Sequence, residues 1–321
     1  MFDIYFYEAF EEEAETIKQY LPPEIKAGFS WKTVQETGHT TPPAKLISMR
    51  TQSQIPTGWA VKLSGLLSRS TGYDHVQRYR QSVGTELPAG YLPLYCNRSV
   101  AEQAMLLWMS LLRKFPRQLQ QFANFHRDGL TGFETEHKTL LVVGVGNIGS
   151  EVVKIGLGLG MKVLGVDLVE KYDFVHYTTI EKGLPQADII VCAMNLTEQN
   201  VSYFDYRRLK QAKKGIVFVN IARGEMSPAQ DLLRLIDEQH LGGVGLDVYN
   251  RESLLAVALR TGQTSNDPEV AATLELANRP NVILTPHNAF NTAEAVQRKA
   301  EQSVRQTEHF LQTGSFLWPV P

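Results

Sequence analysis

The chain has 321 residues, 43 % of them hydrophobic, a length that about two globular domains would fill. Its 32 basic residues nearly balance 34 acidic ones, so the charge predicts no attraction to nucleic acid or to an anionic membrane. No apolar run approaches the ~20 residues of a membrane span, and the acidic start of the chain does not resemble a secretory signal.

The two cysteines, Cys96 and Cys192, have neither the spacing of a metal site nor that of a disulfide framework. Small buried thiols are the expected interpretation of both. Together with the missing signal sequence, they favour a cytoplasmic protein that holds no metal.

The first hundred residues alternate between short strands and helices. Strands are expected over 3–7, 45–49 and 66–70, and a helix over 11–21 with its acidic residues in the first turn. A longer helix is expected over 99–125, because Val100, Met105 and Met109 recur at helical spacing. Pro116 should kink or divide that helix, since proline lacks a backbone N–H.

A regular βαβ rhythm begins at residue 139. The expected strands cover 139–144, 162–166, 187–194, 215–221, 243–248 and 282–285. A helix over 293–311 ends the pattern, and 260–267 is expected to be a polar loop. The alternation predicts an α/β fold with a doubly wound parallel sheet.

A glycine-rich turn follows the first of these strands. Gly144, Gly146 and Gly149 have the Gly-x-Gly-x-x-Gly spacing, and Asp167 ends the next strand about 20 residues later. In such a turn the second glycine lets the backbone approach a pyrophosphate, and the acid accepts from the ribose hydroxyls. Because this acid would repel the 2′-phosphate of NADP, the predicted cofactor is NAD.

Three polar clusters come at the ends of later strands, where the ligands of open α/β sheets bind. They contain Arg223, then Asp247 with Glu252, and finally His287. An imidazole can exchange a proton near neutral pH, a nearby carboxylate favours the imidazolium, and a guanidinium can hold a 2-oxo acid. Each residue taken alone has an ordinary structural interpretation, and Asp247 is either a turn acid or a contact to the nicotinamide amide. Their repetition at one sheet edge favours catalysis.

The ordered motifs resemble the D-isomer-specific 2-hydroxyacid dehydrogenases, in particular their D-lactate dehydrogenase-like branch. Besides the motifs above, Arg69–Asp74 resembles the substrate-domain turn, and Tyr95 with Ser99–Glu102 resembles the entry to the interdomain helix. The resemblance implies two Rossmann-like domains, with a cofactor domain inserted into a split substrate domain. The boundaries expected are 1–98 with 291–321 for the substrate domain and 99–290 for the NAD-binding domain.

The resemblance also implies roles for individual residues. His287 would be the acid/base, Glu252 its partner and Arg223 the substrate-binding arginine, with Thr71, Gly72 and Tyr95 also contacting the substrate. The cofactor contacts would come from residues of the glycine turn, the ribose acid and the later strand ends: Gly144, Gly146, Asn147, Ile148, Gly149, Asp167, Met194, Asn195, Asn200, Ile221, Ala222, Arg223 and Asp247.

The chain departs from the family pattern at several positions. Ala193-Met194-Asn195 stands where the family usually has His-Val-Pro, so one wall of the cofactor site is altered. Arg50 falls where several relatives place an aromatic residue beside the substrate. Two interpretations of Arg50 are open: a surface residue, or a ligand for a second negative charge on the substrate.

We therefore expect an NAD-dependent D-2-hydroxyacid dehydrogenase that works as a 2-oxoacid reductase, with D-lactate dehydrogenase among the candidate activities. A homodimer formed through the cofactor domain is also expected from the resemblance. The alternative is an NAD(H)-sensing protein of the corepressor type with little turnover. Measured turnover separates the two.

Overall fold

The structure is a computed structural model that describes residues 2–262 and 265–321. These residues form two compact units, one made of the chain up to Cys96 together with Asn291–Pro321, and the other of Asn97–Phe290. Within the described residues the strands form two sheets, one of five strands and one of six, and all of their pairings are parallel. This arrangement confirms the predicted α/β class.

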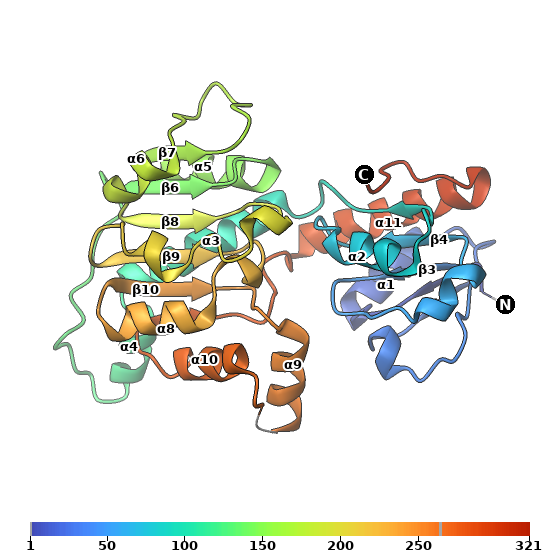
Figure 1. Cartoon of the computed structure of the whole chain (residues 1–321), viewed down its shortest axis with the longest axis horizontal. Helices are drawn as coiled ribbons and strands as arrows, with labels where there is room; N and C mark the ends of the chain where they lie inside the picture. The colour runs from blue at the N-terminus through green and yellow to red at the C-terminus, as the bar shows by residue number, and fades with distance from the viewer. Residues whose placement is uncertain (1, 263–264) are drawn as a thin grey trace. The chain divides into compact units, whose positions relative to one another are not determined.

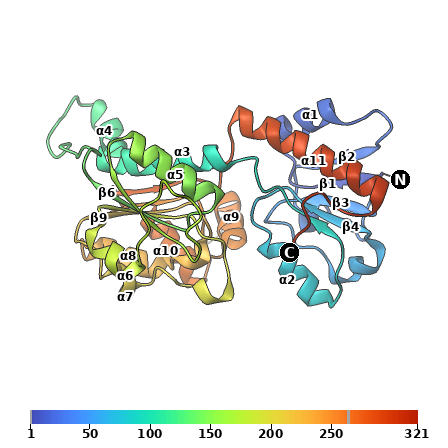
Figure 2. The same ribbon diagram turned by 90° about the horizontal axis from the view of Figure 1, so that it is seen from above.

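The first unit is built on the five-stranded sheet, in the order β2-β1-β3-β4-β5. Its strands and helices are β1 (Ile4–Phe6), α1 (Glu11–Tyr20), β2 (Ala27–Phe29), η1 (Val34–Glu36), β3 (Leu46–Met49), η2 (Thr57–Lys62), β4 (Gly65–Ser68), α2 (Asp74–Val83), β5 (Ala89–Gly90) and α11 (Ala293–Thr313). Helices α1 and α11 lie side by side on one face of this sheet, and α2 lies on the other (Figure 2). The interior strands β3 and β4 are buried along their whole length, as expected for a parallel sheet covered on both faces.

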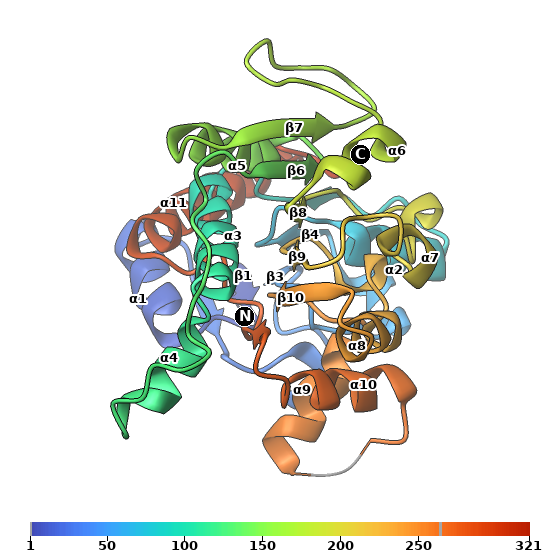
Figure 3. The ribbon, with the colours of Figure 1, turned by 90° about the vertical axis from the view of Figure 1, so that its left-hand side faces the viewer.

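The second unit is built on the six-stranded sheet, in the order β11-β10-β9-β8-β6-β7 (Figure 1). Its strands are β6 (Thr139–Val143), β7 (Lys162–Val166), β8 (Ile189–Cys192), β9 (Ile216–Asn220), β10 (Leu241–Leu246) and β11 (Val282–Leu284). Its helices are α3 (Asn97–Leu112), α4 (Phe115–Phe122), α5 (Asn147–Gly158), α6 (Ile180–Gly183), η3 (Leu184–Gln186), η4 (Glu198–Asn200), α7 (Tyr206–Leu209), η5 (Gly224–Met226), α8 (Ala229–Asp237), α9 (Glu252–Thr261) and α10 (Pro268–Leu276). Helices α3 and α5 cover one face of the sheet, and α8 lies against the other (Figure 3).

The helix expected over 99–125 is divided near Pro116, as predicted. It forms two helices, because Lys114 takes a left-handed conformation (φ 52°) and Pro116 occupies the first turn of α4. Proline is tolerated there, where its missing N–H would have no helical partner. The polar loop expected over 260–267 begins later than predicted, since α9 continues to Thr261, and residues 263–264 of that prediction lie outside the described residues.

Among residues 2–262 and 265–321, no helix combines the length and the apolar character that crossing a membrane requires.

Candidate active site

The glycine turn joins β6 to α5 in a backbone path that leaves little space for side chains. A Cβ on Gly144, whose φ is 91°, would lie 2.5 Å from the backbone nitrogen of Met194, and a Cβ on Gly149 would collide with the carbonyl oxygen of Gly144. A Cβ on Gly146 would point into open space. The turn is therefore closed on the protein side and open at Gly146, next to the N-terminus of α5, as a pyrophosphate-binding loop requires.

Asp167 lies directly after β7 and ties this strand end to the glycine turn. One carboxylate oxygen accepts from the backbone N–H of Val145 at 2.6 Å, and the other accepts from that of Val169 at 3.2 Å. The same carboxylate lines a hollow of about 680 Å³ together with Glu170, His176 and Tyr177. A hollow with an acid at the end of the second strand fits the ribose end of NAD.

The loop after β8 is held by its own polar side chains. The side chain of Asn200 accepts from the backbone N–H of Thr197 at 2.8 Å and donates to the carbonyl oxygen of Asn195 at 2.7 Å. Met194 is half-buried and packs against the core of the unit. The observed contacts of Asn200 thus shape the loop that contains Met194 and Asn195.

Arg223 follows β9 in a segment that a buried amide holds in place. The side chain of Asn220 donates to the carbonyl oxygen of Arg223 at 2.9 Å and to Oγ of Ser227 at 2.8 Å, and it accepts from the N–H of Ala222 at 2.9 Å. Arg223 itself is half-buried and donates to the carbonyl oxygen of Ala222 at 2.8 Å. No role is expected for Asn220 from the sequence, although a buried amide at the end of an apolar strand indicates a side chain that holds the following turn.

His287 and Glu252 form a direct pair, although 34 residues separate them in the chain. Nδ1 of His287 lies 2.8 and 2.9 Å from the two carboxylate oxygens of Glu252. Both side chains are about one-fifth exposed, at 22 % and 20 %. Because Nδ1 donates to the carboxylate, the other ring nitrogen, Nε2, is the one that can transfer a proton.

Asp247 holds the loop that contains His287. One of its oxygens accepts from Oγ1 of Thr285 at 2.6 Å and from the N–H of Asn288 at 2.9 Å, and the other accepts from the N–H of Ala289 at 2.9 Å. Burial raises the pKa of Asp247, while these hydrogen bonds and the charge of His287 act in the opposite direction. Since His287 has a left-handed backbone (φ 51°), such bracing offsets a conformation that is unfavourable for a non-glycine residue.

The catalytic candidates therefore follow three neighbouring strands of one sheet. Arg223 comes after β9, Asp247 and Glu252 after β10, and His287 after β11, and these three strands pair in that order. Ile221 and Ala222, predicted to contact the nicotinamide side, are buried beside Arg223. The carboxyl ends of neighbouring parallel strands meet at one edge, so their loops are brought together.

The other residues predicted to bind the substrate, besides Arg223, lie in the first unit. Oγ1 of Thr71 donates to the carbonyl oxygen of Leu92 at 3.2 Å, and Oγ of Ser70 donates to that of Gly72 at 2.7 Å. Tyr95 is buried and Arg50 is half-buried. Thr71 and Gly72 follow β4, and Arg50 follows the adjacent strand β3.

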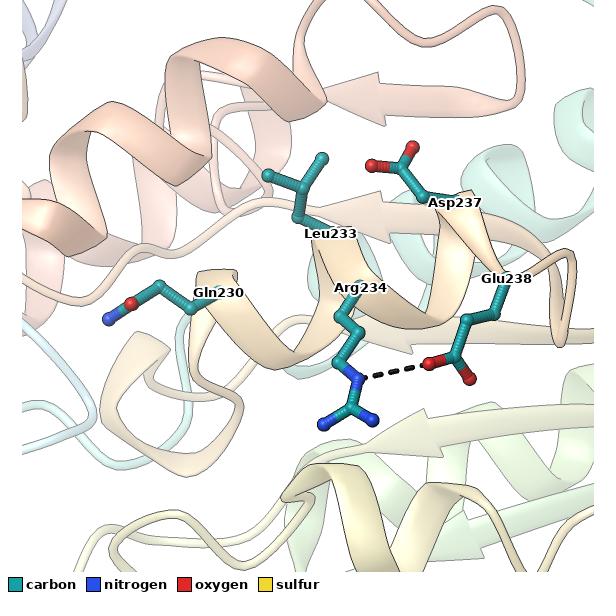
Figure 4. Close-up of a pocket in the computed structure, with 5 residues that line it drawn as sticks. All are labelled: Gln230, Leu233, Arg234, Asp237 and Glu238. Carbon is teal, nitrogen blue, oxygen red and sulfur yellow. Dashed lines mark hydrogen bonds and ion pairs between the residues drawn. The ribbon is translucent and has the colours of Figure 1, made fainter.

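A different hollow lies on the outer side of α8 and has no relation to these strand ends. Gln230, Leu233, Arg234, Asp237 and Glu238 line it, and Figure 4 shows Arg234 and Glu238 pointing toward one another. Arg234 donates to Glu238 at 2.9 Å, and Arg279 donates to Asp237, also at 2.9 Å. The charged side chains of this hollow thus form ion pairs on an exposed helix face, where such pairs contribute little to the stability of the fold.

The glycine turn, the acid after β7 and the strand-end histidine define a dinucleotide-dependent oxidoreductase. The sequence profile of the D-isomer specific 2-hydroxyacid dehydrogenase NAD binding domain matches residues 104–289. The chain belongs to the D-isomer specific 2-hydroxyacid dehydrogenase family. This confirms the predicted family and the predicted cofactor, NAD.

Two curated relatives and one solved structure illustrate the similarity. A D-lactate dehydrogenase of Streptococcus agalactiae is 30 % identical over 233 residues, which cover 70 % of this chain and 69 % of the relative. An aromatic 2-oxoacid reductase of Clostridium sporogenes is 30 % identical over 230 residues, with 70 % and 69 % of the two chains covered. The crystal structure of an Aquifex aeolicus D-lactate dehydrogenase complexed with NAD and lactic acid has a TM-score of 0.84 at 26 % identity and covers 98 % of each chain.

These findings confirm the predicted class, an NAD-dependent oxidoreductase that acts on the CH–OH group of D-2-hydroxy acids. They do not favour the alternative of an NAD(H)-sensing protein with little turnover.

Proposed function

We propose that this dehydrogenase works as a reductase of 2-oxo acids and that His287 supplies the proton. The observation that supports this is the pair of contacts from Glu252 to Nδ1 of His287, at 2.8 and 2.9 Å. A carboxylate in that position stabilises the imidazolium, which is the form that can protonate a developing alkoxide through Nε2. A 2-oxo acid, NADH and one proton would give the D-2-hydroxy acid and NAD⁺.

The remaining site residues take complementary tasks in this proposal. Arg223 holds the substrate carboxylate and polarises the carbonyl group with its permanent charge. The backbone amides of Thr71 and Gly72 receive the same carboxylate, and Tyr95 contacts the substrate. The split first unit then serves as the substrate domain and the second as the NAD-binding domain.

Cofactor binding is proposed for the turn and the strand ends of the second unit. NADH, when bound, supplies the hydride that goes to C2 of the substrate. Asn147 and Ile148 at the start of α5, with the three glycines of the turn, would hold the pyrophosphate, and Asp167 would accept from the ribose hydroxyls. Ile221, Ala222, Met194 and Asn195 would line the nicotinamide side, with Asn200 and Asp247 holding the loops beside it.

We also propose that the protein is a cytoplasmic homodimer formed through the second unit. Phe115, Leu119 and Phe122 of α4 are 47, 61 and 76 % exposed and lie on one helix face at i, i+4 and i+7 spacing. An exposed apolar stripe of this kind is typical of an interface, and a two-fold axis lets the same stripe serve both copies. Cys96 and Cys192 are both buried thiols, which supports a reducing compartment.

The test of the proposed activity is NADH oxidation with pyruvate, glyoxylate, hydroxypyruvate, bulky 2-oxo acids and oxaloacetate, followed by chiral analysis of the product. We expect turnover of at least one of these acids to a D-2-hydroxy acid, and loss of turnover by about 10²- to 10⁴-fold in His287→Ala. Tight NADH binding without turnover of any acid would contradict the reductase and favour the sensor.

A further inference from the structure

A series of side-chain hydrogen bonds lies behind the turn that follows β4. Ser68 is the last residue of β4, Ser70 comes two positions later, and His75 lies in the first turn of α2. Oγ of Ser68 lies 2.7 Å from Oγ of Ser70 and 3.0 Å from Nε2 of His75. Oγ of Ser70 in turn lies 2.7 Å from the carbonyl oxygen of Gly72. These four residues, all in the first unit, form a hydrogen-bond relay.

The last member of the relay fixes the direction of every hydrogen bond in it. A carbonyl oxygen can only accept, so the single proton of the Ser70 hydroxyl points to Gly72. Ser70 must then accept from Ser68, and Ser68, whose own proton is used, must accept from His75. Nε2 of His75 therefore carries a proton, and all donors are directed from the imidazole toward the backbone of Gly72. In such a series each hydrogen bond polarises the next one.

The burial of the two serines makes the relay sensitive to the loss of any member. Ser68 is fully buried and Ser70 is 8 % exposed, whereas His75 is half-buried. Water can replace a lost partner at the surface, but a buried hydroxyl that loses its partner pays for its removal from water. Removal of the His75 donor is therefore felt at the two buried hydroxyls.

The relay ends at the residue of the turn that has the greatest backbone freedom, because Gly72 carries no Cβ. The other side of the turn is tied to Leu92. The N–H of Leu92 donates to the carbonyl oxygen of Ser70 at 3.1 Å, and its carbonyl oxygen accepts from Oγ1 of Thr71 at 3.2 Å. The relay supplies the corresponding tie at Gly72. The turn is thus held on both sides before a ligand arrives, which lowers the entropic cost of binding.

The amides of this turn are available to a ligand. Among residues 2–262 and 265–321, the backbone N–H groups of Thr71 and Gly72 find no hydrogen-bond acceptor. Successive N–H groups that point in one direction can bind an anion, provided that their orientation is fixed. The relay fixes the orientation of the backbone at Gly72.

We propose that His75 is a positioning residue for substrate binding, which acts through Ser68 and Ser70 to hold the backbone of Gly72 in place for the substrate carboxylate. The inference rests on the proposed function, in which the amides of Thr71 and Gly72 receive that carboxylate. His75 takes no part in the chemical step, so it affects how tightly the acid binds and not how fast the bound acid reacts.

The test measures kcat and KM for the preferred 2-oxo acid in His75→Phe and in Ser70→Ala. The first variant keeps a ring and removes the Nε2 donor, and the second removes the hydroxyl that contacts Gly72. We expect KM to rise about 5- to 20-fold in each, because a buried hydrogen bond is lost. The value of kcat should stay within about twofold, since an interaction that holds the acid equally before and during the reaction changes KM alone.

Three further variants separate positioning from a general loss of structure. The double variant His75→Phe, Ser70→Ala should have the KM of Ser70→Ala within about twofold, because His75 reaches Gly72 only through Ser70. His75→Gln keeps an N–H donor and should bring KM back to within about twofold of the wild type. His309→Phe changes another half-buried histidine of the first unit, 3.5 Å from a serine hydroxyl, and should alter neither constant. Melting temperatures close to that of the wild type show that the variants are folded.

The outcomes distinguish this inference from the proposed function. An unchanged KM in either single variant, effects that multiply in the double variant, or equal losses in His75→Phe and His75→Gln overturn the inference and leave the reductase intact. If the wild type reduces none of the 2-oxo acids tested above, the reductase fails. Calorimetry with the same acids in the presence of NADH then decides about His75: binding that both single variants weaken supports the inference, and any other result overturns it.

Discussion

Both carboxylate oxygens of Glu252 lie within hydrogen-bond distance of Nδ1 of His287, at 2.8 and 2.9 Å. Glu252→Gln keeps the size of this side chain and removes the carboxylate that orients the imidazole through Nδ1. We expect kcat of reduction to fall about 10- to 100-fold, because the proposed proton donor loses its charged hydrogen-bond partner.

Turnover is measured with the preferred 2-oxo acid at constant pH and ionic strength. Glu275→Gln, which removes an exposed carboxylate from α10, is the matched control and should leave kcat unchanged. A wild-type kcat in Glu252→Gln would show that the pair does not support the proton donor.

Asp247→Asn tests whether this carboxylate positions His287 or contacts the cofactor. The amide nitrogen of asparagine cannot accept the N–H and O–H groups that Asp247 accepts from the 285–289 loop. We expect kcat to fall about 10- to 100-fold, because a buried donor without a partner costs ~1–3 kcal/mol and releases the loop. The Kd of NADH, measured by fluorescence, should stay within about twofold. A large rise of that Kd with normal kcat would support the contact to nicotinamide instead.

Asp167→Ser tests the choice of NAD over NADP. Loss of the carboxylate removes an acceptor for the ribose hydroxyls and also the hydrogen bond to Val145. We expect kcat/KM with NADH to fall about 10-fold and the ratio of NADPH to NADH activity to rise. Glu170→Gln changes another acid in the same hollow and should have the smaller effect. An unchanged ratio in Asp167→Ser would rule out the proposed role of this acid.

The buried cation Lys299 makes the stability of the protein depend on pH. Burial lowers the pKa of Lys299 to about 7 from its ordinary value of 10.5; Glu13 opposes this, while Arg50 and Arg69 reinforce it. Between these two values the unfolded chain binds more protons than the folded chain, so this lysine makes stability rise with pH. The free energy of unfolding of Lys299→Met, taken relative to that of the wild type, should therefore be highest near pH 6. This difference should fall by up to roughly 1.4 kcal/mol per pH unit as the pH rises toward 9.

Urea unfolding of the two proteins at pH 6, 7.5 and 9 measures this difference. Lys62→Met, which changes an exposed lysine of the same unit, controls for the loss of a charge. A difference between Lys299→Met and the wild type that is constant with pH would mean that Lys299 keeps its proton throughout this range.

The exposed stripe on α4 predicts the oligomeric state. Light scattering after size-exclusion chromatography should give a dimer for the wild type and a monomer for the double variant Leu119→Ser, Phe122→Ser. Both side chains are more than half exposed in the single chain, so their replacement should change the stability of the monomer little. Val61→Ser, at an exposed valine of the first unit, should remain a dimer. A monomeric wild type would end this proposal.

Much of the fold follows from local patterns that are visible in the sequence. The strand expected over 139–144 runs into Gly144, Gly146 and Gly149, a pattern that predicts a buried strand, a tight turn and a helix, and the structure has all three. The strand expected over 162–166 has those same bounds. Pro116 predicts the division of the long helix, because its ring and missing N–H act on the adjacent turn. These features depend on neighbours in the chain, so no tertiary contact is needed to foresee them.

Other features exist only because distant segments meet. Glu13 has the sequence pattern of a solvated acid in the first turn of a helix, yet it is fully buried against Arg69 and Lys299. The spacing along the chain likewise does not show that both oxygens of Asp247 bind the loop around His287. The burial and the partners of these groups are decided when parallel strands close into a sheet and a C-terminal helix packs beside the first one. The residue types predict the chemistry of the site, whereas tertiary packing decides which charges are paired and which loops they hold.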